Sequence, residues 1–145
     1  MFEAPKRRVE KVFIHCSASD MALRDNTLVN EITHWHLDRG FNDIGYHFVI
    51  DKLGTLLTGR SLEKIPAAQK GHNTGSIAIC VHGYASFTVT SRHRLRAFCA
   101  EINEAYFGRI TFHGHCEVSP KACPIFNYRK LLSLDQWGRM PANLE

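Results

Sequence analysis

The chain has 145 residues, 44% of them hydrophobic and 22% charged, and this length and composition are typical of a single globular domain with its own core. We therefore expect one domain over residues 1–145. Its 18 basic and 14 acidic side chains give a formal net charge of +4. This mild excess is compatible with an anionic polymer as partner, but it does not indicate direct nucleic-acid binding.

Apolar patterning predicts short strands that alternate with two long helices. The first helix should run from a cap at Asn26 or Thr27 to Arg39, and the second from Thr90 or Ser91 to Gly108. The expected strands are residues 9–15, 46–50, 55–59, 76–81 and 109–112, and a short helix is expected at 128–134. Such a pattern predicts an α/β fold, in which a central mixed sheet is flanked by helices.

Neither the cysteines nor the chain's amino terminus indicates export. The cysteines number five and form no C-x-x-C pair, which argues against a disulfide framework and favours folding in a reducing cytosol. The N-terminal segment lacks the apolar run of a signal peptide, and no stretch reaches the roughly 18 apolar residues of a spanning helix. We expect synthesis in the cytoplasm and no membrane partner.

A metal site is suggested by the positions of two histidines and one cysteine. His15 ends the first predicted strand, where α/β proteins usually bind ligands, and His115 and Cys123 lie in the irregular segment 114–124. Two imidazoles and one thiolate would make a three-ligand zinc site whose fourth position stays open for water. The alternative is that Cys123 only packs in the core. The zinc deaminase pattern is excluded, because no P-C-x-x-C follows the H-x-E at His115.

Several motifs in register resemble the type-2 N-acetylmuramoyl-L-alanine amidases, a family that includes T7 lysozyme-like phage endolysins and, more distantly, peptidoglycan recognition proteins. The similarity extends from about residue 9 to residue 130. The motifs are Phe-Ile-His-Cys-Ser-Ala (13–18), Trp-His (35–36), Asp-Ile-Gly-Tyr-His-Phe (43–48), Lys-Gly-His-Asn (70–73) with Ser-Ile (76–77), and His-Cys-Glu-Val-Ser-Pro-Lys-Ala-Cys-Pro (115–124).

This resemblance implies a fold, a reaction and a set of site residues. The implied reaction is zinc-dependent hydrolysis of the amide bond between N-acetylmuramic acid and L-alanine in peptidoglycan. One catalytic Zn²⁺ would be held by His15, His115 and Cys123, the trio that spacing had suggested, and Tyr46 and Lys121 fall on the family's catalytic positions. Without the resemblance, Tyr46 would be a strand aromatic and Lys121 a solvated loop charge.

Four further positions carry weaker expectations. We expect Glu117 to cap its own loop, the alternative being a carboxylate that supports a ligand or transfers a proton. His47 should be structural, pointing to the face opposite Tyr46, whereas Asn73 either holds a loop or touches substrate. T7-type enzymes carry a histidine two residues before Lys70, where this chain has Ala67-Ala68-Gln69. This departure predicts a different contact with the substrate and leaves the reaction unchanged.

Two alternatives remain beside a phage endolysin that reaches the wall through a separate factor and acts as a monomer. The first is a non-catalytic peptidoglycan-binding module, against which Cys123 is the discriminating residue, because such modules typically lack this thiolate. The second is an amidase that also binds and inhibits an RNA polymerase, with the basic segment Lys6-Arg7-Arg8 as part of the contact.

Overall fold

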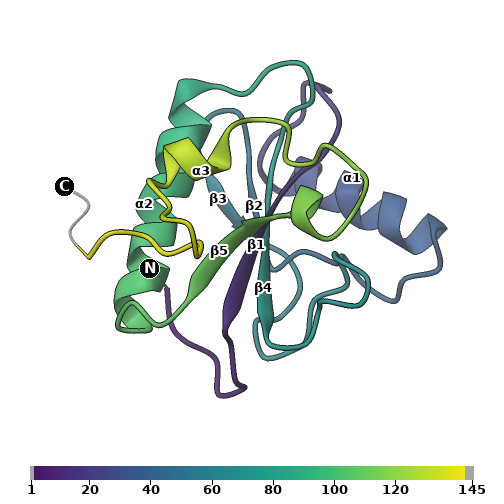
Figure 1. The fold of residues 1–145 in the computed structure, drawn as a ribbon. Coiled ribbons are helices and arrows are strands. Elements are labelled where there is room, and N and C mark those ends of the chain that lie inside the picture. Colours follow the sequence, from purple (N-terminus) through teal and green to yellow (C-terminus); the bar gives the residue numbers. More distant parts are fainter. Residues whose placement is uncertain (1, 143–145) are drawn as a thin grey trace.

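The computed structural model describes residues 2–142. Its centre is one five-stranded sheet in the order β3-β2-β4-β1-β5 (Figure 1). Four strands run parallel and β3 pairs antiparallel with β2, so the predicted mixed sheet is confirmed. The strands are β1 (Lys11–Cys16), β2 (Phe48–Ile50), β3 (Leu56–Thr58), β4 (Ser76–Val81) and β5 (Thr111–Gly114).

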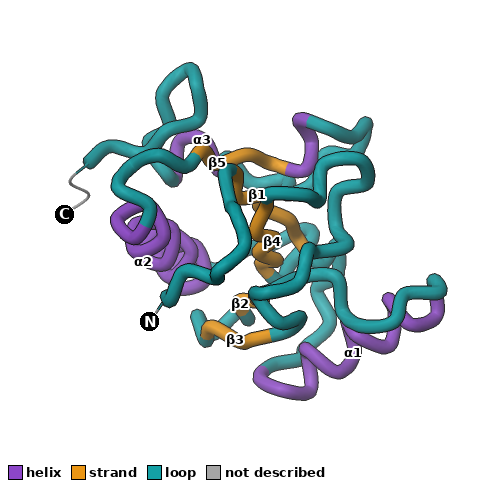
Figure 2. Tube along the Cα trace, turned by 90° about the horizontal axis from the view of Figure 1, so that it is seen from below, coloured by secondary structure: helices purple, strands orange, loops and turns teal. Residues whose placement is uncertain are grey.

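Helices cover both faces of this sheet. Figure 2 shows α1 (Asp25–Asp38) on one side and α2 (Val89–Ala105) on the other. The short α3 (Tyr128–Leu131) follows the one-turn 3-10 helix η1 (His115–Glu117) in the chain and lies beside α2 (Figure 1). No helix within residues 2–142 is long and apolar enough to cross a membrane.

The alternation of side chains along each strand divides the interior in two. In β1, Val12 and Ile14 belong to the larger apolar cluster, which is completed by Leu95, Phe98 and Ile102 of α2. The intervening residues of β1, among them His15, must face the opposite side because successive strand side chains alternate. On that side the apolar cluster is smaller and comprises Leu28, Ile32, Ile44, Val49 and Cys80. The strand that carries His15 therefore fills the core with one face and presents the histidine on the other.

The two long helices begin in different ways. Thr88 caps α2, because its side-chain oxygen accepts the N–H of Ser91 at 3.1 Å. This cap lies two residues before Thr90, the earlier of the two predicted starts. At the start of α1 the Asp51 carboxylate accepts the N–H of Asp25 at 3.1 Å. The N-cap residue is Arg24, whose own side chain makes no capping bond. The bond comes instead from a residue far along the chain, which explains why the local signal at Asn26 or Thr27 was two or three residues late.

Other predicted boundaries also differ from the structure: β2 begins at Phe48 and not at Tyr46, and α2 ends at Ala105 and not at Gly108. Strand β5 ends at Gly114 because it continues to pair with β1, Ile14 lying opposite Gly114. The helix expected over 128–134 ends at Leu131, and Ser133 has a φ of 54°. A left-handed residue stops an α-helix.

Candidate active site

The parallel pairing of β1 with β5 brings two predicted ligands together. Ile14 lies opposite Gly114, so the residues that follow them, His15 and His115, are neighbours at the carboxyl ends of the strands. Their ring centroids are 4.5 Å apart. Parallel β-strands thus place side chains 100 residues apart in the sequence at one edge of the sheet.

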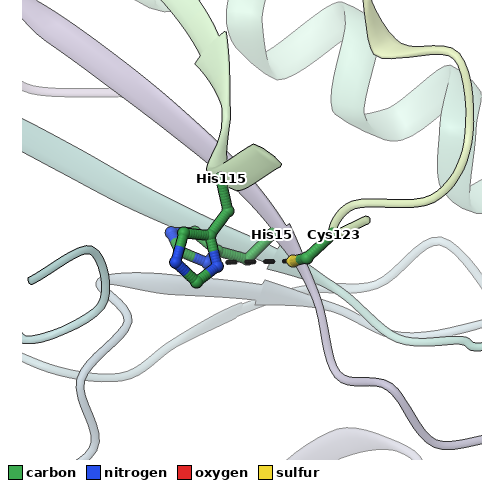
Figure 3. A group of neighbouring side chains, drawn as sticks. All are labelled: His15, His115 and Cys123. Atoms are coloured by element: carbon green, nitrogen blue, oxygen red, sulfur yellow. Dashed lines mark hydrogen bonds between the residues drawn. The ribbon is translucent and has the colours of Figure 1, made fainter. Parts of the chain in front are cut away.

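Cys123 reaches the same place from the loop after η1. Its Sγ is 4.0 Å from Nδ1 of His15 (Figure 3) and accepts the backbone N–H of Cys16 at 3.1 Å. A backbone hydrogen bond of 2.7 Å from Cys116 to the Cys123 carbonyl folds the loop back on itself. One ligand atom from each of His15, His115 and Cys123 lies within 4.8 Å of the others. The three residues are close enough to hold a metal ion.

Glu117 holds the segment that carries His115. Its carboxylate accepts the N–H of Gly114 at 2.9 Å, contacts His113 Nδ1 at 2.9 Å, and accepts the hydroxyl of Tyr128. A side chain at Gly114 would collide with the Tyr128 ring. The expectation that Glu117 caps its own loop is confirmed.

The electrostatics of the two histidines match the protonation state that a metal needs, whereas those of the metal-free cysteine favour the thiol. Burial lowers the pKa of His15 to about 3, and burial followed by the charge of Lys121 lowers that of His115. Both imidazoles are therefore neutral at pH 7 and have a lone pair to donate. The hydrogen bond with the Cys16 thiol, and then burial, raise the pKa of Cys123. A thiolate at this position needs a nearby cation, and a metal ion between the three ligands would supply one.

Tyr46 and Lys121 line the same cavity as His115 and Cys123, with a volume of about 160 Å³. The Tyr46 ring lies 5.1 Å from the His15 ring. Burial raises the pKa of the phenol well above its usual value, so the hydroxyl stays protonated. Lys121 is exposed at the rim. The structure thus gathers all five residues that the sequence singled out.

Three residues near the site were missed as functional candidates. Arg39 lines the cavity. His36 is buried and accepts the Gly45 N–H at 2.8 Å through Nδ1, with its ring 5.2 Å from that of Tyr46. Gln69 is fully buried and its Oε1 is 2.8 Å from Nε2 of His15. His36 stood in one of the family motifs and Gln69 in the departure from them, so both had a signal in the sequence.

Two expected positions lie away from the cavity. His47 is buried between the Ala78 N–H, 3.1 Å from its Nδ1, and the Lys64 carbonyl, 2.8 Å from its Nε2, which agrees with a structural role. Asn73 accepts the N–H groups of Ala68 and Gln69 at 3.1 and 2.9 Å. Of its two expected roles, holding the loop is the one that these contacts support.

Comparisons with known proteins identify the family of the chain. The family model for N-acetylmuramoyl-L-alanine amidase matches residues 5–126. The endolysin of Escherichia phage T7 is 34% identical over 133 residues, covering 86% of both chains. The endolysin of Klebsiella phage KP32 is 32% identical over 133 residues, again 86% of both chains.

Solved structures share the fold. N-acetylmuramoyl-L-alanine amidase LysC from Clostridium intestinale superimposes with a TM-score of 0.76 at 23% identity, covering 88% of this chain and 85% of the other. Drosophila PGRP-LB gives a TM-score of 0.72 at 24% identity over 97% and 87% of the two chains. The mixed sheet with helices on both faces is thus the amidase and peptidoglycan-recognition fold. The chain belongs to the N-acetylmuramoyl-L-alanine amidase family, and the predicted amidase activity is confirmed at the level of this family.

Proposed function

We propose that the protein is a zinc-dependent endolysin that cleaves peptidoglycan between N-acetylmuramic acid and the first L-alanine of the stem peptide. The observation that carries this proposal is the ligand set: His15, His115 and Cys123 offer three ligand atoms within 4.8 Å of one another, beside a cavity lined by Tyr46 and Lys121. Three protein ligands are typical of catalytic zinc, because the fourth position remains open.

The donor set fits Zn²⁺ in kind as well as number. Neutral imidazoles and a thiolate are ligands that zinc accepts, whereas Mg²⁺ and Ca²⁺ prefer oxygen. When bound, zinc polarises a substrate carbonyl and lowers the pKa of bound water toward about 7. With one thiolate and two neutral imidazoles the site would carry a net charge of about +1.

Tyr46 and Lys121 supply the remaining groups that amide hydrolysis needs. The protonated Tyr46 hydroxyl can donate a hydrogen bond to the attacking water or to the tetrahedral intermediate. Lys121, two residues before Cys123, can place a cation near the oxygen on which negative charge develops. Its charge already acts on the two histidines, since it contributes to lowering the pKa of both His15 and His115.

The endolysin role rests on the relatives, four of which are named endolysins from T7-like and related phages. We infer synthesis in the host cytoplasm, release to the wall through a separate factor, and action as a monomer. An RNA polymerase partner stays a prediction. Arg7 of the basic N-terminal segment bonds the carbonyls of Leu62 and Ser76 at 2.8 Å each, so this side chain stabilises the fold.

The test is product analysis of purified peptidoglycan digested by the zinc-loaded protein. The proposal predicts new amino termini on L-alanine and no new reducing sugar ends. Reducing ends without new amino termini would indicate a glycosidase and contradict it. Binding to peptidoglycan with no product at all, at full zinc occupancy, would favour the non-catalytic alternative.

A further inference from the structure

Gln69 lies directly behind the proposed metal ligand His15. It belongs to the loop between β3 and β4, yet its side chain is 0% exposed. The Oε1 atom is 2.8 Å from Nε2 of His15, and the amide nitrogen is 2.7 Å from Oγ of Ser76 and 3.3 Å from the carbonyl oxygen of His72. Both ends of the amide therefore have partners.

The surrounding hydrogen bonds permit only one orientation of this amide. The His72 carbonyl can only accept, and the Ser76 hydroxyl already donates to the Asn73 carbonyl at 2.8 Å, so both face the NH₂ end of Gln69. The oxygen end must then face His15. A carbonyl oxygen accepts only, which means that His15 must donate through Nε2–H.

The tautomer of His15 follows from this orientation. A neutral imidazole carries one proton, so a proton on Nε2 leaves Nδ1 with a free lone pair. Nδ1 is the atom that lies 4.0 Å from Cys123 Sγ. The nitrogen available for a metal is therefore the one that faces the other ligands.

The side chains of Ser76 and Asn73 hold Gln69 in place. Ser76 begins β4 and lies opposite Lys11 of β1, on the same pair of strands that carries His15. The Gln69 N–H is itself bonded to Asn73 Oδ1 at 2.9 Å. The side-chain amide of Gln69 is thus tied to the sheet through Ser76, and its backbone N–H is tied to the loop through Asn73.

We infer that Gln69 is a positioning residue, which locks His15 in the tautomer and ring orientation that present Nδ1 to the metal. The inference rests on the metal site of the proposed function. A hydrogen-bond acceptor on the remote nitrogen of a histidine ligand is a general requirement of metal sites. In this chain it is met by a neutral amide, which leaves the charge of the site unchanged. The departure at 67–69 thus has two parts: Ala67 and Ala68 line the cavity, where a different substrate contact was expected, and Gln69 lies behind the ligand.

The test compares Gln69→Met, which keeps the volume and removes the acceptor, with Gln69→Glu, which keeps an acceptor toward His15. Zinc affinity is measured by competition with a chelator, and the tautomer of His15 by ¹⁵N NMR of the metal-free protein. Gln69→Met should bind zinc about 10–100-fold more weakly and show mixed His15 tautomers. Gln69→Glu loses the donors toward Ser76 and the His72 carbonyl and should be less stable, but it should keep the Nε2–H form and bind zinc more tightly than Gln69→Met.

Two controls separate positioning from simple stability. Gln136→Met makes the same substitution at an exposed site, and Ile102→Val removes a methylene from the buried cluster under α2. Both should leave zinc affinity and tautomer unchanged. If Gln69→Met fails to fold, Gln69→Asn, whose amide stops one methylene short of His15, should show the same weakened binding and mixed tautomers.

Wild-type zinc affinity together with an unchanged His15 tautomer in Gln69→Met, or in Gln69→Asn if that variant is needed, would overturn the inference. A wild-type protein that binds no zinc would instead refute the proposed function. In that case the tautomer measurement on the metal-free protein still decides whether Gln69 sets the protonation of His15.

Discussion

The two faces of the sheet use the same strands and bury different kinds of side chain. Under α2 the interior is an apolar cluster, in which Leu95, Phe98 and Ile102 are fully buried. On the side of α1 the buried groups include His15 and His36, with the amide of Gln69 behind His15. Polar groups cost free energy when buried unless they are hydrogen-bonded. The face under α2 therefore contributes most of the stability, and the face on the side of α1 carries the chemistry.

The largest effect should follow from removing the thiolate on the functional face. Cys123→Ser should lose zinc and reduce amidase turnover to background, because a hydroxyl is a much weaker zinc ligand than a thiolate. Zinc content and amino-terminus release measure this. Cys99→Ser is the matched control: Cys99 is fully buried in the cluster under α2, so this variant should lose stability and keep its metal. Full turnover in Cys123→Ser at stoichiometric zinc would show that the ligand is wrong.

On the apolar face under α2, a substitution should reduce stability and leave zinc binding unchanged. Phe98 is fully buried and its ring centroid lies 4.7 Å from that of Phe48. Phe98→Ala should lower the free energy of unfolding by about 3–5 kcal/mol, and Phe98→Leu by less, while the folded fraction keeps the wild-type zinc affinity. Urea denaturation and chelator competition measure the two quantities. A matching loss of zinc affinity would mean that the two faces are not independent.

Within the site, Lys121 separates turnover from metal binding, because it can affect turnover without holding the metal. Lys121→Ala should reduce kcat by roughly 10²–10³ at unchanged zinc occupancy. Lys121→Arg should restore part of it, since a planar guanidinium places its charge differently from a compact ammonium. Steady-state kinetics on soluble muropeptide are the measurement. An increase in KM alone would make Lys121 a substrate anchor, and near-normal turnover in both variants would remove it from the catalytic groups.

A smaller effect should appear in the pH dependence of stability. Burial lowers the pKa of His47 to about 4, from an ordinary value of 6.5. Its Nδ1 accepts the Ala78 N–H, so protonation would set two donors against each other. Between these pH values the unfolded chain binds the proton and the folded chain does not. The stabilisation is complete above about pH 6.5 and is lost as the pH falls toward 4, with a slope of up to about 1.4 kcal/mol per pH unit for one proton.

Denaturation curves between pH 4.5 and pH 7 test this effect. His47→Gln should flatten the slope, because one group that takes up a proton on unfolding is gone. His93→Gln replaces an exposed histidine of α2 and controls for the loss of an imidazole. Equal slopes in the wild type and in His47→Gln would contradict the assignment.

Much of the fold was predictable because its signals are local. Strand β4 (Ser76–Val81) was predicted over its full length, since residues 77–81 form a continuous apolar run. The stripe of Leu95, Phe98, Cys99 and Ile102 likewise identified α2. Contacts between distant residues carry no such signal. The carboxylate of Asp51 that caps α1 lies 26 residues from its partner, and the cap was missed for that reason.

The residues of the site likewise fall into those that local motifs identify and those that depend on distant contacts. His15, His115 and Cys123 were identified from their motifs, and the structure adds the register of β1 and β5 that brings the two histidines together. Gln69 could not be assigned from its own segment, because its role depends on a hydrogen bond to a residue 54 positions away. Motifs indicate which residues act, and the partners that orient them become visible only in three dimensions.

The central claim is that His15, His115 and Cys123 hold one zinc ion on which hydrolysis depends. X-ray absorption at the zinc edge of the purified, active protein tests it most directly. The predicted spectrum has one sulfur at about 2.3 Å and two imidazole nitrogens at about 2.0–2.1 Å, with one zinc per chain. A spectrum without sulfur, or a zinc-free protein that still releases L-alanine amino termini at the wild-type rate, would contradict the claim.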